Sequence, residues 1–116
     1  MSNFKNKYNF KERLKESTTI MLKYPDRVPI ICEKSSRYND IPDIDKHKYL
    51  APVDLTIGQF IYTIRSRMEL SPYRALFLII NNTIPPTSAL LGTIYSQYHD
   101  EDKFLYITYT SENTFG

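Results

Sequence analysis

The sequence predicts one α+β domain in which helices cover a four-stranded mixed sheet. Its 116 residues are enough to bury a core without disulfides or metals. Segments with helical or strand periodicity follow in the order helix, strand, strand, helix, strand, helix, strand. The last strand, residues 104–110, carries large β-branched and aromatic side chains on both faces, which is typical of a strand in the middle of a sheet.

The N-terminal part has the spacing of an amphipathic helix over residues 10–23, preceded by a short helix or arm at residues 3–9. The expected buried stripe of the longer helix is Phe10, Leu14, Ser17, Thr18 and Met21. Glu16 and Ile20 lie together outside this stripe, so Ile20 is an apolar side chain that the main core does not need. Pro25 ends the helix because proline disfavours helical backbone in the preceding residue.

Residues 28–34 form a predicted strand with apolar groups on both faces, so each face needs a cover. The N-terminal helix is the natural cover for one of them. Pro29 has no N–H to donate, which predicts that this strand lies at an edge of the sheet, where a partner strand could add. Residues 48–53 form a second strand that we expect to be antiparallel to the first.

Thr56 and Gln59 have the spacing of a capping box, which predicts a helix that runs to about Met68. Its expected core stripe is Ile57, Ile61, Ile64 and Met68. Phe60 flanks that stripe, so it is a second large apolar side chain that the core face does not need.

The remaining predicted elements are a strand at residues 75–80, a short helix that follows it and the final strand. The complete set predicts a β-grasp, the ubiquitin architecture, with an extra N-terminal helical layer. The expected organisation is a helical layer in residues 1–26, a ubiquitin-like core in residues 27–110 and a flexible tail in residues 111–116 that ends at Gly116.

Composition excludes several classes of protein. The formal net charge is +2, and the N-terminal segment is mildly basic. This is only a weak indication of nucleic-acid binding, because no zinc motif or cluster of arginines accompanies it. The first residues lack the apolar segment of a secretory signal, so we expect none, and the sequence has no apolar run of transmembrane length. A single cysteine, Cys32, fits a reducing compartment.

The candidates for catalysis are few. Cys32 lies in the middle of a strand, where a buried thiol is inert, and neither His47 nor His99 belongs to a motif that would activate it. One cysteine and two distant histidines supply no metal site, and three glycines supply no phosphate-binding loop. We therefore predict a protein that is not an enzyme and that uses no cofactor or metal.

Two groups of residues from neighbouring elements could instead line peptide-binding pockets beside the expected edge strand. The first group is Glu16, Ile20, Pro29, Ile31, Lys48, Leu50 and Phe104. The second is Tyr49, Ala51, Pro52, Leu55, Phe60 and Ile64. For each residue taken alone, ordinary core packing is the better explanation; as a set along one strand they indicate a groove.

The chain resembles the autophagy ubiquitin-like modifiers, the group that includes GABARAP, over essentially its whole length. The segments that carry the resemblance are RVPIICEK at 27–34, DIDKHKYLAP at 43–52, DLTIGQF at 54–60, NNTIPP at 81–86 and ENTFG at 112–116. The resemblance implies a protein tag whose C-terminal glycine, here Gly116, is exposed by a cysteine protease and then joined to phosphatidylethanolamine by activating and conjugating enzymes. It also implies a cytoplasmic protein that reaches autophagosomal and vacuolar (lysosomal) membranes when lipidated.

The resemblance further implies that cargo receptors with aromatic-x-x-aliphatic motifs add as a strand to the first strand. The matching aromatic-pocket positions are Glu16, Ile20, Pro29, Ile31, Lys48, Leu50 and Phe104. The matching aliphatic-pocket positions are Tyr49, Ala51, Pro52, Leu55, Phe60, Thr63 and Ile64. Acidic residues that flank such peptides would meet Arg27, Lys46, Lys48 and Arg67, and a second docking face matches Phe77, Leu78, Ile79 and Ile80. Thr63 replaces a usual aliphatic residue, which predicts a more polar second pocket.

The residues by themselves leave two other classes of protein possible. One is a peptide-binding adaptor or trafficking protein that is never conjugated, in which Gly116 is only a chain end. The other is an enzyme that uses Cys32, which would require a reactive thiol.

Overall fold

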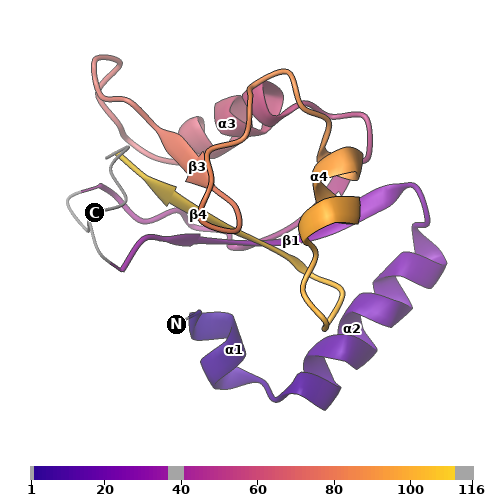
Figure 1. The fold of residues 1–116 in the computed structure, drawn as a ribbon. Coiled ribbons are helices and arrows are strands. Elements are labelled where there is room, and N and C mark those ends of the chain that lie inside the picture. Colours follow the sequence, from indigo (N-terminus) through magenta and orange to yellow (C-terminus); the bar gives the residue numbers. More distant parts are fainter. Residues whose placement is uncertain (1, 37–40, 112–116) are drawn as a thin grey trace.

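The computed structural model describes residues 2–36 and 41–111 and contains a four-stranded mixed sheet between two helical layers (Figure 1). The elements in chain order are α1 (Asn3–Lys7), α2 (Phe10–Lys23), β1 (Arg27–Lys34), β2 (Lys48–Pro52), α3 (Ile57–Arg65), β3 (Phe77–Ile79), α4 (Leu91–Tyr98) and β4 (Leu105–Thr110). Helices α1 and α2 lie on one side of the sheet, and α3 and α4 lie on the other. The predicted β-grasp with an N-terminal helical layer is confirmed.

The strand order is β2-β1-β4-β3, so β4 lies inside the sheet as predicted. β1 is also an interior strand, antiparallel to β2 and parallel to β4, and its predicted edge position is wrong. The pairing of β1 with β4 begins at Ile30 opposite Leu105, one residue after Pro29. Pro29 is tolerated because it precedes that ladder and removes none of its hydrogen bonds. In the described sheet the edge strands are β2 and β3.

Both faces of β1 are buried, as its sequence predicted. Val28, Ile30 and Cys32 belong to the main hydrophobic core, together with buried side chains of α3 and α4. Ile31 is equally buried but lies outside that core, on the face that the N-terminal helices cover.

Helix α3 begins with the predicted capping box, in which the Thr56 side chain and the Gln59 side chain each accept from the other residue's backbone N–H. It ends at Arg65 and not at Met68, because the N–H groups of Arg67 and Met68 turn back to bond carbonyls three residues earlier. The prediction that Phe60 flanks the core is also wrong: the ring is fully buried and packs edge-on against Tyr49, with ring centres 5.4 Å apart.

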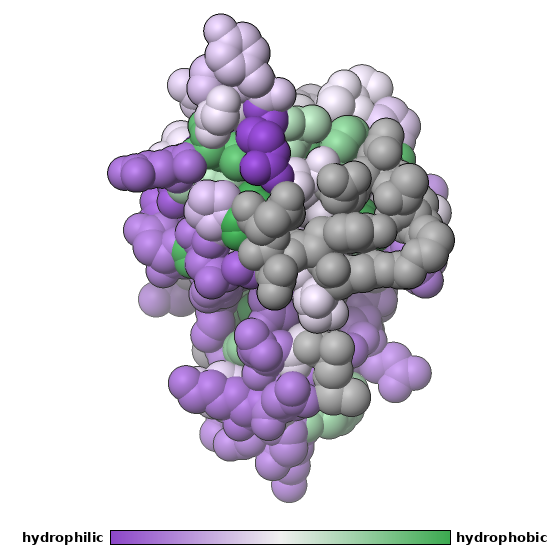
Figure 2. Space-filling model, turned by 90° about the vertical axis from the view of Figure 1, so that its left-hand side faces the viewer, coloured by the Kyte–Doolittle hydropathy of each residue, from purple (hydrophilic) through white to green (hydrophobic). Residues whose placement is uncertain are grey.

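Helix α2 buries only part of its predicted stripe: Ser17 is buried as predicted, whereas Thr18 is exposed and Leu14 and Met21 are partly buried. Its buried residues are Arg13 and Ser17, whereas the Phe10 side chain is 45% exposed. Arg13 donates from Nε to Oδ2 of the fully buried Asp102 at 2.8 Å, and Ser17 Oγ donates to the Asp102 carbonyl at 2.6 Å. Figure 2 shows that the lower end of the molecule, where α1 and α2 lie in Figure 1, is mainly hydrophilic. The N-terminal layer is therefore attached in part through buried polar contacts to Asp102.

No helix in the described part of the chain is both long and apolar enough to cross a membrane.

Candidate functional site

The outer edge of β2 has free backbone groups at alternate residues. The Cys32 N–H bonds the His47 carbonyl, and the Val53 N–H bonds the Asp26 carbonyl. Because backbone groups alternate sides along a strand, the odd-numbered residues of β2 face β1, while Lys48 and Leu50 direct their N–H and C=O groups outward. An added strand would therefore pair with β2, the neighbour of the strand for which the sequence predicted this role.

The structure brings the predicted aromatic-pocket residues together at this edge. Pairing of β1 with β2 places Pro29 opposite Leu50 and Ile31 opposite Lys48, so the four side chains share one face of the sheet. From α2, the Glu16 carboxylate forms an ion pair with Lys48 Nζ. Ile20 lies one helical turn after Glu16 and is half-buried.

Phe4 is a residue of this region that sequence reasoning missed. Its ring lies 5.2 Å from that of Phe104 in an edge-on arrangement, and Lys48 Nζ lies 5.3 Å from the centre of the Phe4 ring. Phe104 and Ile31 are fully buried, while Leu50 is partly exposed. Phe4 and the Lys48–Glu16 pair thus lie against the residues predicted for the aromatic pocket. The only available signal was one aromatic residue in a short polar segment.

The predicted aliphatic-pocket residues fall into a buried and an accessible group. Tyr49, Ala51, Phe60 and Ile64 belong to the main core, and burial raises the pKa of Tyr49 to about 12. Pro52 is exposed, and Leu55 and Thr63 are partly buried. The Thr63 hydroxyl donates to the Gln59 carbonyl at 3.1 Å, so it already has a partner within its own helix. These accessible positions form a shallow surface beside β2.

The basic residues expected to meet acidic flanks differ in their surroundings. Lys46 Nζ lies 5.1 Å above the Tyr49 ring, next to the aliphatic group. Arg67 Nε forms an ion pair with Asp45 at 3.2 Å, so an incoming carboxylate would compete with Asp45 there. Arg27 is exposed at the start of β1.

The residues of the second predicted docking face lie on and next to β3, the other edge strand. Phe77 and Ile79 are partly exposed, whereas Leu78 and Ile80 are buried in the core. Of these four side chains, only Phe77 and Ile79 are therefore accessible to a partner.

The chemistry of the described residues offers little for catalysis. Cys32 is fully buried, and burial raises the pKa of its thiol far above the ordinary range. In residues 2–36 and 41–111, no three His, Cys, Asp or Glu side chains gather as metal ligands would. Gly116 and the other tail residues 112–116 lie outside the described residues.

Residues 12–116 match the family described as "Autophagy protein Atg8 ubiquitin like". The chain belongs to the Atg8 family. This confirms the resemblance drawn from the sequence motifs, and it places the chain among ubiquitin-like proteins of autophagy.

Atg8 relatives match along nearly the whole chain. Autophagy-related protein 8 of Schizosaccharomyces pombe is 56% identical over 115 residues, which make up 99% of this chain and 94% of the relative. The protein of the same name from Mycosarcoma maydis is 53% identical and covers 99% of this chain and 97% of its own length.

Solved Atg8 structures have the same fold. Trypanosoma brucei ATG8 superimposes with a TM-score of 0.90 at 44% identity, and the match covers 100% of this chain and 99% of that one. Plasmodium falciparum Atg8, solved in complex with a P. falciparum Atg3 peptide, gives a TM-score of 0.85 at 33% identity and covers 97% and 98% of the two chains.

Proposed function

We propose that this Atg8-family protein is a modifier that becomes covalently attached, through Gly116, to phosphatidylethanolamine on autophagosomal membranes. The observation that carries the proposal is membership of the Atg8 family, with 56% identity to the S. pombe protein along the chain. The protein acts as a substrate of other enzymes and not as a catalyst, which agrees with the inert environment of Cys32. It is cytoplasmic before conjugation and lies on the autophagosomal or vacuolar membrane afterwards.

The proposed chemistry uses the carboxylate of Gly116. The carboxylate attacks the α-phosphate of ATP, which gives an acyl adenylate and releases pyrophosphate. A thiolate of the activating enzyme then displaces AMP, and the acyl group passes from this thioester to a thiolate of the conjugating enzyme. In the last step the amine of phosphatidylethanolamine attacks the thioester, an amide bond forms and the enzyme thiolate leaves. Glycine suits this sequence because it has no Cβ to obstruct a narrow channel or the attacking group.

We further propose that the outer edge of β2 binds peptides with an aromatic-x-x-aliphatic motif. Backbone groups of Lys48 and Leu50 would pair with the peptide strand, which is how an exposed edge gives affinity with little sequence preference. The aromatic anchor would enter beside Ile20 and Leu50 after the Lys48–Glu16 pair opens, and the aliphatic anchor would lie near Pro52, Leu55 and Thr63. The complex of P. falciparum Atg8 with an Atg3 peptide supports peptide binding by this fold.

Reconstitution tests the conjugation. The purified chain is incubated with Atg8-activating and conjugating enzymes, ATP and phosphatidylethanolamine liposomes, and the product is followed by gel shift and intact mass. We expect a lipid adduct for the wild type, a strongly reduced yield for Gly116→Ala, and a normal yield for Leu22→Ala, which changes an exposed side chain on α2.

An unmodified wild-type protein under conditions that lipidate the S. pombe relative would instead favour the alternative, a non-covalent adaptor or trafficking protein.

A further inference from the structure

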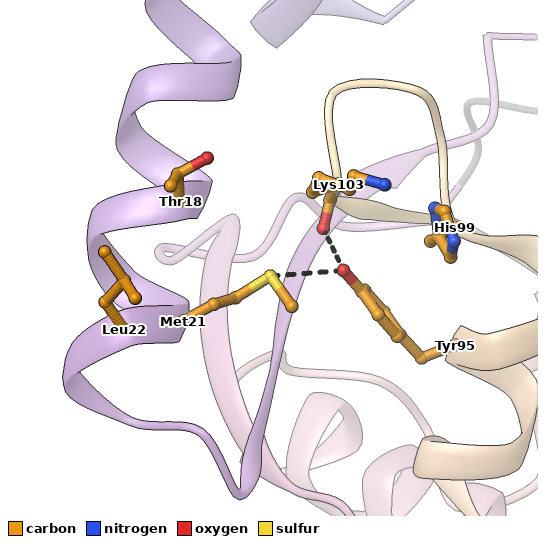
Figure 3. Close-up of a pocket in the computed structure, with 6 residues that line it drawn as sticks. All are labelled: Thr18, Met21, Leu22, Tyr95, His99 and Lys103. Atoms are coloured by element: carbon orange, nitrogen blue, oxygen red, sulfur yellow. Dashed lines mark hydrogen bonds between the residues drawn. The ribbon is translucent and has the colours of Figure 1, made fainter.

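A pocket of about 360 Å³ lies between α2 and the end of α4, and no residue of the edge strands β2 and β3 lines it. Its lining residues are Thr18, Met21, Leu22, Tyr95, His99 and Lys103. Figure 3 shows Met21 reaching from α2 toward Tyr95, and Lys103 on the loop that faces Thr18. We call this space the α2–α4 groove; none of its lining residues belongs to the β2 site.

The floor of the α2–α4 groove is apolar although a tyrosine contributes to it. The Tyr95 hydroxyl donates to the Lys103 carbonyl at 2.7 Å and also contacts Met21 Sδ at 3.2 Å, so it is occupied within the protein. The His99 ring lies 5.0 Å from the Tyr95 ring and contacts the Asp100 carbonyl through Nδ1. Leu22 is 81% exposed and adds an apolar side chain to the lining of the groove.

The rim of the groove is basic. Lys11, Lys15, Thr18 and Leu22 have the spacing of one face of α2, so the two lysines lead along the helix into the groove. Across the groove, Lys103 has a φ of 71°, a conformation that non-glycine residues rarely adopt. None of these three lysines has an ion-pair partner within residues 2–36 and 41–111.

The nearby carboxylates do not neutralise this rim. Asp100 is paired with Lys5, and the buried Asp102 is paired with Arg13. Glu101 is exposed in the same loop and is the one acidic side chain there without a described partner. Lys103 lines the groove, and Lys11 and Lys15 continue along the same face of α2, whereas Glu101 is the one carboxylate of the 100–102 segment without a described partner. This excess of positive charge favours an occupant with negative charge.

The form of that occupant follows from the backbone around the groove. Both walls are helix and loop, and the edge strands that could accept a peptide strand lie elsewhere. A partner must therefore satisfy its own backbone hydrogen bonds and present side chains alone, as an amphipathic helix does. We propose that the α2–α4 groove binds an acidic amphipathic helix of a partner protein, with apolar side chains over Met21 and Leu22 and carboxylates at Lys15 and Lys103.

Helix binding at the α2–α4 groove is separate from conjugation and from peptide binding at β2, so its test needs neither the conjugation enzymes nor a β2 peptide. The probe is a synthetic helical peptide of about four turns, with leucines along one face and glutamates elsewhere. Its binding to the isotope-labelled full chain is followed by NMR chemical shifts. We expect saturable shifts centred on the lining residues, and binding at least tenfold weaker for a peptide with lysine in place of each glutamate.

Matched variants locate the contact. Leu22→Glu is expected to weaken the acidic peptide at least tenfold, whereas Tyr62→Glu, which changes another exposed apolar side chain on α3, leaves it unchanged. Lys103→Asn, which suits the same backbone conformation, should weaken it a few-fold. The Leu22→Glu protein should still bind an aromatic-x-x-aliphatic peptide. Loss of helix binding at the groove can therefore be distinguished from loss of peptide binding at the β2 site.

Three outcomes overturn the proposal. The first is the absence of saturable binding by the acidic peptide. The second is equal binding by Leu22→Glu or by the lysine-bearing peptide. The third is that the chain binds phosphatidylserine vesicles but not the peptide, and that Leu22→Glu abolishes the vesicle binding. This result would assign the groove to a membrane surface.

Discussion

Asp102 is the residue that most firmly joins the N-terminal layer to the ubiquitin-like core. Its buried carboxylate accepts from Arg13 Nε at 2.8 Å, from the Tyr106 hydroxyl at 2.5 Å and from the Phe104 amide at 2.9 Å. Burial and the Asp102 hydrogen bond both raise the pKa of Tyr106, which keeps its hydroxyl a donor. A buried charge is tolerated here because these three donors are directed at the carboxylate.

Replacement of Asp102 by alanine should therefore be strongly destabilising. It leaves the Arg13 guanidinium buried without its anion, so we expect a loss of about 3 kcal/mol or more in the free energy of unfolding. Urea denaturation measures it, with Glu101→Ala as the exposed control that should change stability by roughly 0.5 kcal/mol or less. A loss for Asp102→Ala as small as that of the control would show that the network contributes nothing.

At the scale of single elements, β2 is the strand on which the proposed peptide site depends. It is an edge because the chain places β1 between it and β4. Its residues alternate between a buried set, Tyr49 and Ala51, and an outward set, Lys48, Leu50 and Pro52. The same strand thus anchors the core and offers free backbone groups to a partner.

Leu50→Ala should weaken an aromatic-x-x-aliphatic peptide, because it removes an apolar wall of the aromatic pocket. The anchor burial at stake is about 1.5–3 kcal/mol, or roughly a tenfold to hundredfold loss of affinity. Isothermal titration calorimetry measures it, and Leu22→Ala is the matched control, since the same change on α2 lies outside the β2 site. Unchanged affinity in a folded Leu50→Ala protein would refute the assignment.

Helix α1 rests on the surface of the sheet through a small set of contacts. It has no buried residue, and its contacts to the sheet are few. Glu33 accepts from Ser2 Oγ at 2.6 Å and from the Phe4 amide at 3.1 Å, and Lys5 pairs with Asp100 at 2.6 Å. Because the Phe4 ring packs on Phe104, we expect the position of α1 to affect access to the proposed aromatic pocket.

At the scale of the whole molecule, docking of the N-terminal layer should depend on pH through Asp100. Burial opposes ionisation of this carboxyl, but hydrogen bonds from Lys5 and from the Asp102 amide outweigh it and lower its pKa. A lowered pKa in the folded state means that the stabilisation is complete above the ordinary aspartate pKa, near about 4, and is lost as the pH falls through the lower folded value.

Lys5→Met should raise the pKa of Asp100 toward its ordinary value and reduce the pH-dependent part of the docking, because the Lys5–Asp100 pair is then absent at every pH. An NMR titration of the Asp100 carboxyl carbon measures the pKa, and the shifts of α1 amides report the docking. Lys7→Met is the control, because Lys7 is exposed on the same short helix and forms no described ion pair. An Asp100 pKa that is the same in both variants would contradict the role given to Lys5.

The sequence by itself determined the order of the elements, the Thr56–Gln59 cap, the two buried faces of β1 and the membership of the Atg8 family. These follow from periodicity, local hydrogen bonding and motif order, which act over short stretches of chain. Only the tertiary structure decided that β1 is interior, that Phe60 is core and that Arg13 is buried with Asp102. Each of these depends on which distant segments pack together, and a local pattern such as a proline in a strand does not encode the strand that forms on its other side.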